Sequence, residues 1–361
     1  MSNFEDNISF LKQSPVFSMS LGSKELFHSN FWAWIIEQEE GRPFINVFFP
    51  DFKLSDFKEV KREDGNRDLV IRDVAGNEYV IENKIKSYPS LKQIEEYPCF
   101  KGVLTGIKEP PFELPKKWEF KSYKTIGEEL QSIARCFPEG FNRKIIEEYS
   151  KVVLAIYEII DESLNERKEY LSFETSKTSD LQSIRMLDVY KKAKADDFAV
   201  RCEDLIKDIK PLIKKTGWDC WISRSFHNGK ATISFDIQKG SEDKYKGMIG
   251  VQIEDNQFRL FLGVSEKKGM HAKEIFDQGI KMGWFDSTFE KKTNRTVFGH
   301  PTKMSKTPCS YSDRWVYQYF DTWTEECDLQ QYDLLKSLID KWLKKAVEII
   351  NNDPIADVIF N

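Results

Sequence analysis

Two carboxylates and a lysine occur close together in the stretch 66–86, which reads NRDLVIRDVAGNEYVIENKIK. Asp68 precedes one run of β-branched residues, and Glu82 and Lys84 lie at the end of the next. Two carboxylates can hold a hard divalent cation such as Mg²⁺, and a neighbouring ammonium group can stabilise negative charge that develops on a phosphate. These residue types therefore point to hydrolysis of a phosphodiester bond.

A β-hairpin is the element that must bring these side chains together. The runs 69–74 and 79–85 flank the turn signal Gly76-Asn77, which predicts two antiparallel strands. With the turn centred there, Asp68 is expected beside residues 83–85, and the glutamate and lysine share one face because they are two positions apart. Strands this apolar are usually buried, and buried charges need partners such as a metal ion.

The pattern of Asp68 followed by Glu82-Asn83-Lys84 resembles the PD-(D/E)XK nuclease superfamily. In that superfamily an acidic residue on one strand and an acid-x-lysine on the next build a magnesium site. Arg67 stands where the family name has proline, a position at which proline is often missing.

Two flanking segments extend this resemblance over roughly Ser23 to Phe137. Downstream, LKQIEEY places Gln93 and Tyr97 at i and i+4 on one helical face, similar to the QxxxY element of RecB-like members. Upstream, SKELFHSNFWAWIIEQ is similar to the first helix of a bacterial branch, with Glu25 where many members carry an additional acidic residue.

The resemblance implies a restriction-endonuclease-like α/β core of mixed α+β type, in which helices flank a mixed sheet. It also implies a Mg²⁺ (or Mn²⁺) ion held by the carboxylates of Asp68 and Glu82 and by the backbone carbonyl of Asn83. Lys84 would orient the attacking water. The catalytic residues implied are Glu25, Asp68, Glu82, Lys84, Gln93 and Tyr97, of which the glutamine and tyrosine would position the lysine or the nucleic-acid backbone.

The first helix leaves two interpretations open. Glu25, His28 and Trp32 fall at i, i+3 and i+7, so that this helix could aim a carboxylate and an imidazole towards the hairpin. A packing role explains the histidine as well, and a glutamate in a first helical turn is also explained by the helix dipole.

Composition describes an ordinary globular chain. It has 361 residues, of which 40% are hydrophobic and 31% charged, enough for two domains with cores. The net charge of -5 argues against a generally basic nucleic-acid coat, although a local basic cleft stays open. The six cysteines form no CxxC pair and predict neither a zinc site nor a disulfide framework. With no signal-like or membrane-spanning run, we expect a cytoplasmic protein without a membrane contact.

Three parts are expected along the chain: a nuclease-like domain over 1–170, a helical linker over 171–216 and a β-rich C-terminal domain over 217–361. Alternating runs over 219–224, 230–238, 246–254 and 257–264 predict the strands of the last part. Its aromatic residues could stack bases or form the core of a sheet. They are Trp218, Trp221, Phe226, Phe235, Phe258 and Phe261.

The sequence thus favours a metal-dependent endo- or exonuclease acting on nucleic acid, with DNA as the expected substrate and RNA as an alternative. A role in restriction or antiviral defence is an expectation by family analogy alone. The rival hypothesis is a non-catalytic binding or scaffold protein on the same fold. In the nuclease the C-terminal domain would recognise the substrate or a partner, and in the scaffold it would be the working surface. A protein partner or homo-oligomerisation could use this domain. No GxxxxGK[ST], GxSxG or HExxH motif occurs, so ATP-driven, serine-hydrolase and zincin chemistry lack support.

Overall fold

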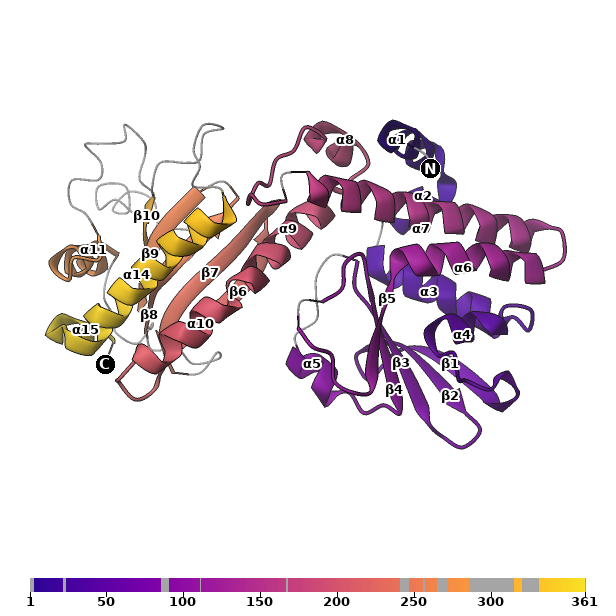
Figure 1. Ribbon diagram of the computed structural model, residues 1–361, viewed down its shortest axis with the longest axis horizontal. Helices are drawn as coiled ribbons and strands as arrows, with labels where there is room; N and C mark the ends of the chain where they lie inside the picture. The colour runs from indigo at the N-terminus through magenta and orange to yellow at the C-terminus, as the bar shows by residue number, and fades with distance from the viewer. Residues whose placement is uncertain are drawn as a thin grey trace. The chain divides into compact units, whose positions relative to one another are not determined.

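The computed structural model describes residues 3–21, 24–85, 91–110, 112–166, 168–240, 247–255, 257–264, 272–285, 315–319 and 331–360. The chain forms two compact units (Figure 1). Unit 1 consists of Met1–Glu166 and Glu174–Ala193, and unit 2 consists of Arg167–Phe173 and Lys194–Asn361.

The segment expected as a linker, 171–216, is instead divided between the two units. Its apolar residues explain the division, because each half completes a different core. Leu181 and Val189 belong to the core of unit 1, whereas Phe198 and Leu205 belong to that of unit 2.

Unit 1 combines one sheet with several helices. Its helices are α1 (Phe4–Gln13), α2 (Pro15–Ser20), α3 (Lys24–Glu37), α4 (Ile45–Phe48), α5 (Leu91–Glu96), α6 (Tyr123–Cys136), α7 (Phe141–Asn165) and α8 (Thr178–Ser183), and α9 (Leu187–Arg201) begins in it. Its strands are β1 (Phe57–Asp64), β2 (Arg67–Asp73), β3 (Glu78–Asn83), β4 (Lys101–Gly106) and β5 (Trp118–Ser122).

The sheet of unit 1 has the order β1-β2-β3-β4-β5. The first three strands are antiparallel neighbours, whereas β3, β4 and β5 run parallel. The expected mixed sheet with flanking helices is confirmed.

The two faces of this sheet bury different clusters. Leu69 and Ile81 point into the main core, which includes residues of α3, α6 and α7. Val70 and Val80 point to the opposite face, where they pack with Ile94 of α5. Figure 1 shows α5 on its own side of the sheet, away from α3 and α6. Any side chain in register with Val70 or Val80 therefore projects towards the α5 side.

The β2–β3 turn differs by a small shift from the expected one. Leu69 pairs with Ile81, which centres the turn near residue 75 instead of on Gly76-Asn77. The cause is Asp73, whose carboxylate accepts hydrogen bonds from the backbone N–H and the side-chain amide of Asn77 at 2.8 and 2.7 Å. This Asx-type capping closes the turn between one and two residues earlier than the Gly-Asn signal predicts.

Unit 2 is built on the second sheet. Its strands are β6 (Trp218–His227), β7 (Lys230–Lys239), β8 (Gly247–Glu254), β9 (Gln257–Val264) and β10 (Trp315–Tyr319). Its helices are the remainder of α9, α10 (Glu203–Ile209), α11 (Ala272–Lys281), α14 (Tyr332–Asn352) and α15 (Pro354–Phe360). The predicted β-rich character and all four predicted strands are confirmed.

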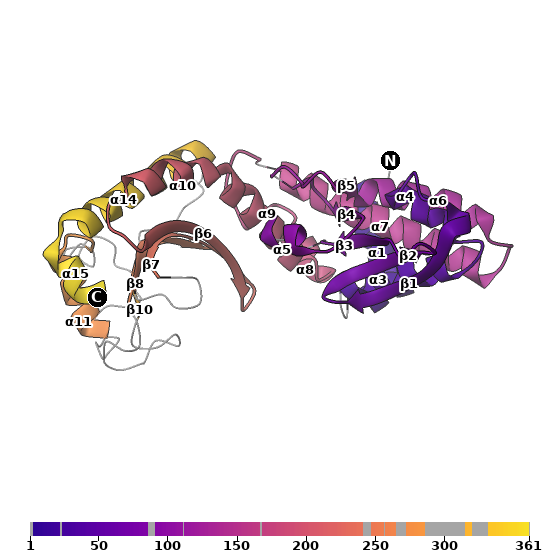
Figure 2. The same cartoon turned by 90° about the horizontal axis from the view of Figure 1, so that it is seen from below.

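The second sheet has the order β10-β9-β8-β7-β6, and all its neighbours are antiparallel. Figure 2 shows that it is strongly curved, with α10 and α14 outside the curve. Ile233, Val251 and Leu260 belong to the apolar core on this helix side. The intervening residues project from the other face, because side chains alternate along a strand.

No helix in the described parts of the chain combines the length and apolar character needed to cross a membrane.

Candidate metal centre

Asp68 and Glu82 lie on adjacent strands of unit 1, at the position next to the Leu69–Ile81 pair. This register places both carboxylates on the α5 side of the sheet, in line with Val70 and Val80. The shift in the turn therefore moves Asp68 from its expected place beside residues 83–85 to a place opposite Glu82, where the two carboxylates lie on one face.

Two contacts define the cluster. The backbone N–H of Asn83 donates a hydrogen bond to Asp68 Oδ2 at 2.7 Å. Lys84 Nζ lies 2.8 Å from Glu82 Oε1, and only 1% of the glutamate side chain and 19% of the lysine side chain are exposed. Asp68, Glu82 and Lys84, which the sequence predicts as site residues, are thus brought together.

Burial dominates the electrostatics of the two acids. It raises the pKa of Asp68, and the charge of Glu25 raises it further, while the Asn83 N–H and Lys84 act in the opposite direction. Burial also raises the pKa of Glu82, followed by the charge of Asp68, against the lowering effect of Lys84. Each carboxylate therefore makes the ionised form of the other less favourable, and positive charge placed between them would be stabilising.

Lys84 stays charged in this setting. Burial lowers its pKa, but the carboxylates of Glu82, Asp68 and Glu25 together raise the pKa above its ordinary value. An ammonium group beside two acids is thereby held at one position, ready to meet developing negative charge.

Asn83 fixes the end of β3 from the opposite face. Its side-chain amide donates to the backbone oxygen of Glu25 at 2.8 Å and to Ser29 Oγ at 3.3 Å, both on α3. Its side-chain oxygen accepts hydrogen bonds from Thr105 Oγ1 at 3.0 Å and from the Tyr123 hydroxyl at 2.5 Å. One buried amide thus joins β3 to α3, β4 and α6, and it sets the first turn of α3 near the carboxylates.

The remaining predicted residues have different places. Glu25 is half-buried on α3, close enough to Asp68 and Lys84 to shift the pKa of both. Tyr97 follows the end of α5, and its hydroxyl donates to the backbone oxygen of Asn66 at 2.8 Å, in the β1–β2 turn. Gln93 lies within α5, but its side chain falls outside the described residues.

His28 takes the packing role. It is fully buried on α3, and its Nδ1 lies 2.7 Å from the Tyr149 hydroxyl of α7. Burial lowers the pKa of His28 to about 3, so the ring is neutral and its Nδ1 shares one hydrogen bond with the Tyr149 hydroxyl. The imidazole therefore points into the core and not towards the hairpin.

Arg67, which stands at the family's proline position, has a structural explanation of its own. Its guanidinium contacts Glu78 Oε2 at 2.5 Å and donates to the backbone oxygen of Pro98 at 3.0 Å. It therefore ties β2 to β3 and to the segment after α5.

The donor set suits a small, hard cation. Among the described residues, no group of three or more His, Cys, Asp or Glu side chains is arranged to hold a metal ion. Mg²⁺ does not require such a group, because it is commonly bound by one or two carboxylates and several waters. Two adjacent carboxylates whose pKa values are both raised match this requirement.

Sequence reasoning missed the residues that hold the site in place. Ser29, Thr105 and Tyr123 are far apart in the chain, and their common contact with Asn83 depends on the tertiary fold. The signal that was available is Asn83 itself, an amide inside an apolar strand that needs buried hydrogen-bond partners.

Comparisons of this chain with protein-family models, with curated proteins and with solved structures found no match.

Proposed function

We propose that unit 1 is a metal-dependent nuclease of the PD-(D/E)XK type that hydrolyses phosphodiester bonds. The observation that carries this proposal is the cluster of Asp68 and Glu82 on adjacent strands, with Lys84 in contact with the glutamate. A purely structural role explains it less well, because two desolvated acids in the same place oppose each other's ionisation.

The proposal assigns each residue a separate task. Asp68, Glu82 and the backbone carbonyl of Asn83 would hold Mg²⁺ or Mn²⁺, which would polarise the phosphodiester and lower the pKa of a bound water. Lys84 would keep its proton and face the phosphate with a positive charge. Glu25 adds negative charge beside the acids and strengthens the attraction for a cation.

The proposed substrate is DNA, and the proposed setting is restriction or antiviral defence. Both rest on the family resemblance, and RNA is the alternative substrate. Gln93 and Tyr97 belong to the same proposal as residues that position the lysine or the nucleic-acid backbone.

One observation favours a second candidate, a binding or scaffold protein that has kept the fold without the activity. Lys84 and Glu82 form a short ion pair, so half of the cluster is neutralised within the protein. If Glu82 and Lys84 stay paired with each other, the site does not bind a divalent cation.

Metal uptake and cleavage together separate the two candidates. Calorimetric titration with Mn²⁺ and cleavage of plasmid, single-stranded DNA and RNA are measured for the wild type and for Glu82→Gln. The nuclease requires metal binding and metal-dependent cutting that Glu82→Gln removes. Glu59→Gln is the matched control, because Glu59 is a carboxylate of the same sheet that pairs with Arg72. A wild type that takes up no metal and cuts no substrate supports the scaffold.

A further inference from the structure

The face of the unit 2 sheet that lies away from the helices carries a row of unusual composition. Register pairs Trp221 of β6 with Asp236 of β7, Asp236 with Gly250 of β8, Gly250 with Phe261 of β9, and Phe261 with Tyr317 of β10. A carboxylate and a glycine thus occupy the middle of the row, and aromatic side chains stand at both ends. Neighbouring strands lie about 4.8 Å apart, so the aromatic side chains of β6 and β9 stand roughly 14 Å apart across the sheet.

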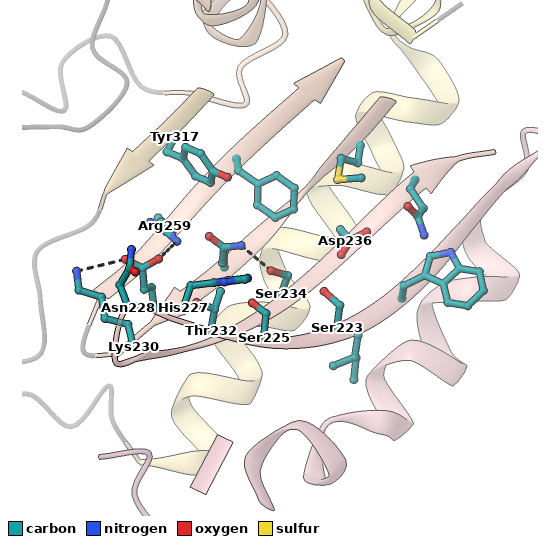
Figure 3. A pocket seen from close by; sticks show the side chains of 17 residues that line it. Ser223, Ser225, His227, Asn228, Lys230, Thr232, Ser234, Asp236, Arg259 and Tyr317 are labelled. Carbon is teal, nitrogen blue, oxygen red and sulfur yellow. Dashed lines mark hydrogen bonds and ion pairs between the residues drawn. The ribbon is translucent and has the colours of Figure 1, made fainter. Parts of the chain in front are cut away.

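This row forms part of the floor of a cavity of about 520 Å³. Such a volume is typical of sites for small ligands. A second row, of Ser223, Ser234, Gln252 and Arg259, runs beside the first and also lines the cavity. Figure 3 shows Ser223, Ser234 and Asp236 projecting from the same face of the sheet.

Asp236 is the residue that most needs an explanation. Only 6% of its surface is exposed, and no hydrogen bond to its carboxylate is found among the described residues. Gly250, its neighbour on β8, has no side chain to cover the Asp236 carboxylate. A Cβ at position 250 would lie 2.3 Å from the backbone oxygen of Phe235. A buried carboxylate without a protein donor is costly, and a ligand that brings N–H groups would remove the cost.

Two further polar atoms in the cavity wall lack partners. Gln252 Oε1 and Trp221 Nε1 are buried without a hydrogen bond in the part of the chain that the structure describes. Gln252 is held by its other end, because its Nε2 donates to Ser234 Oγ at 2.7 Å. The cavity therefore offers acceptors and a donor at fixed positions, next to aromatic surfaces.

The charges of the lining argue against a simple cation as the ligand. Asp236 and Glu254 are its acids, Lys230 and Arg259 are its cationic side chains, and His227 also lines it. Glu254 is already paired with both bases, with Arg259 at 2.5 Å and with Lys230 at 3.5 Å. The described lining thus carries no excess of negative charge, and its aromatic ends favour a planar ligand.

We propose that this cavity binds one nucleobase, with Asp236 accepting hydrogen bonds from the N–H groups of its edge and an aromatic side chain of the row stacking on its face. Guanine fits best, because its N1–H and amino group are adjacent donors that a carboxylate can accept together. The base comes either from a single strand of nucleic acid or from a free nucleotide, since both present the same edge and the same face.

This proposal goes beyond the nuclease function and does not depend on it. It separates the aromatic residues of unit 2 into two groups. Phe235 and Phe258 are core residues on the helix side, whereas Trp221 and Phe261 line the cavity. Trp221, which is partly exposed, is placed for stacking, whereas Phe261 is only 2% exposed and packs beside Tyr317.

The test is a calorimetric titration of the full chain with GMP, AMP, CMP and UMP in the presence of a chelator. The chelator removes any contribution from the metal site, so failure here is distinct from failure of the nuclease proposal. We expect GMP to bind tightest. Asp236→Asn loses the second acceptor oxygen, and Trp221→Leu loses the stacking surface. Each variant should weaken the binding of GMP about tenfold or more. Asp219→Asn changes a partly exposed acid of β6 that pairs with Lys210 and is not among the described residues of the cavity lining, and this variant should bind GMP as the wild type does.

A measurement on the wild type guards against misfolded variants. Amide NMR shifts on addition of GMP should be largest at Asp236, Gly250 and their strand neighbours. Short single-stranded DNA and RNA with one guanine separate the two sources, because a strand site binds them more tightly than GMP and a free-nucleotide site does not. The proposal is overturned if no nucleotide or oligonucleotide binds at millimolar concentration, if the two cavity variants bind like the wild type, or if spermidine alone binds through Asp236.

Discussion

Replacement of Asp236 by asparagine should stabilise unit 2, and the gain should grow with pH. The change keeps the shape of the side chain and removes its ability to ionise. Burial raises the pKa of Asp236 from 3.8 to about 7. The charged groups that share its cavity, Lys230, Glu254 and Arg259, pair with one another, so burial remains the main cause.

The direction of this pH dependence follows from the protons that the folded and unfolded states bind. Between pH 3.8 and about 7 the folded state keeps a proton on Asp236 that the unfolded state has released, so the free energy of unfolding falls as the pH rises. Above pH 7 both states are ionised and the whole penalty is present. A pKa raised from 3.8 to about 7 corresponds to about 4 kcal/mol at 1.36 kcal/mol per unit. Below pH 3.8 the residue contributes nothing.

The free energy of unfolding is measured by urea titration for the wild type and for Asp236→Asn, at about pH 5 and at about pH 8.5. The quantity of interest is the difference between the stabilisation by the variant at the higher pH and that at the lower pH. Contributions from other titrating groups cancel in it, because both proteins share them. We expect the stabilisation by the variant to be roughly 3 kcal/mol larger at the higher pH. Equal stabilisation at both values would refute the reasoning, since it would mean that the carboxyl group titrates in the folded protein as it does in water.

Three further predictions concern unit 1. Lys84→Ala should keep Mn²⁺ uptake in calorimetry but slow cleavage by about a hundredfold or more, and equal rates would exclude the assigned role. Asn83→Ala should lower the free energy of unfolding by about 2–4 kcal/mol, because the buried hydroxyls of Thr105 and Tyr123 lose their shared acceptor; urea titration measures this, and a change near zero would contradict it. The pKa of His28 is lowered from 6.5 to about 3 in the folded protein. Between these two pH values the unfolded state binds a proton on His28 that the folded state does not, so the stability of the wild type falls as the pH falls. His28→Gln should show a shallower loss of stability from pH 6.5 downwards, and an unchanged slope would show that the ring does not stay neutral.

Local patterns predicted the strands well. In β7 and β9 the alternation of apolar residues and the flanking turns are encoded in adjacent residues, and both strands formed within a residue or two of the expected bounds. Helix α6 begins at Tyr123, because Ser122 caps it through a hydrogen bond from the Thr125 N–H at 3.1 Å. The hairpin register moved for a similar reason, the side chain of Asp73.

The candidate site was predictable in its charged residues and not in its support. Asp68, Glu82 and Lys84 could be brought together from strand periodicity alone, since they lie on one hairpin. The contacts of Asn83 with α3, β4 and α6 could not, because they depend on how distant elements pack. The cavity in unit 2 left a signal that was overlooked. Polar residues at every second position of β7, from Lys230 to Gln238, mark a sheet face that is not a packing face.

Segments of the two units alternate along the chain, and this affects how the units can fold during synthesis on the ribosome. Residues 167–173 belong to unit 2 but emerge before the last part of unit 1, 174–193. Leu171 and Phe173 must therefore wait for partners, and Tyr170 bridges to Gln331, which is made much later. Unit 1 can complete its core once Ala193 has emerged, while Leu171 and Phe173 remain unburied. Nascent chains halted after Ala193 has emerged and before Gln331 is made should bind chaperones that recognise exposed hydrophobic segments, through residues 167–173. Full-length chains should not bind them.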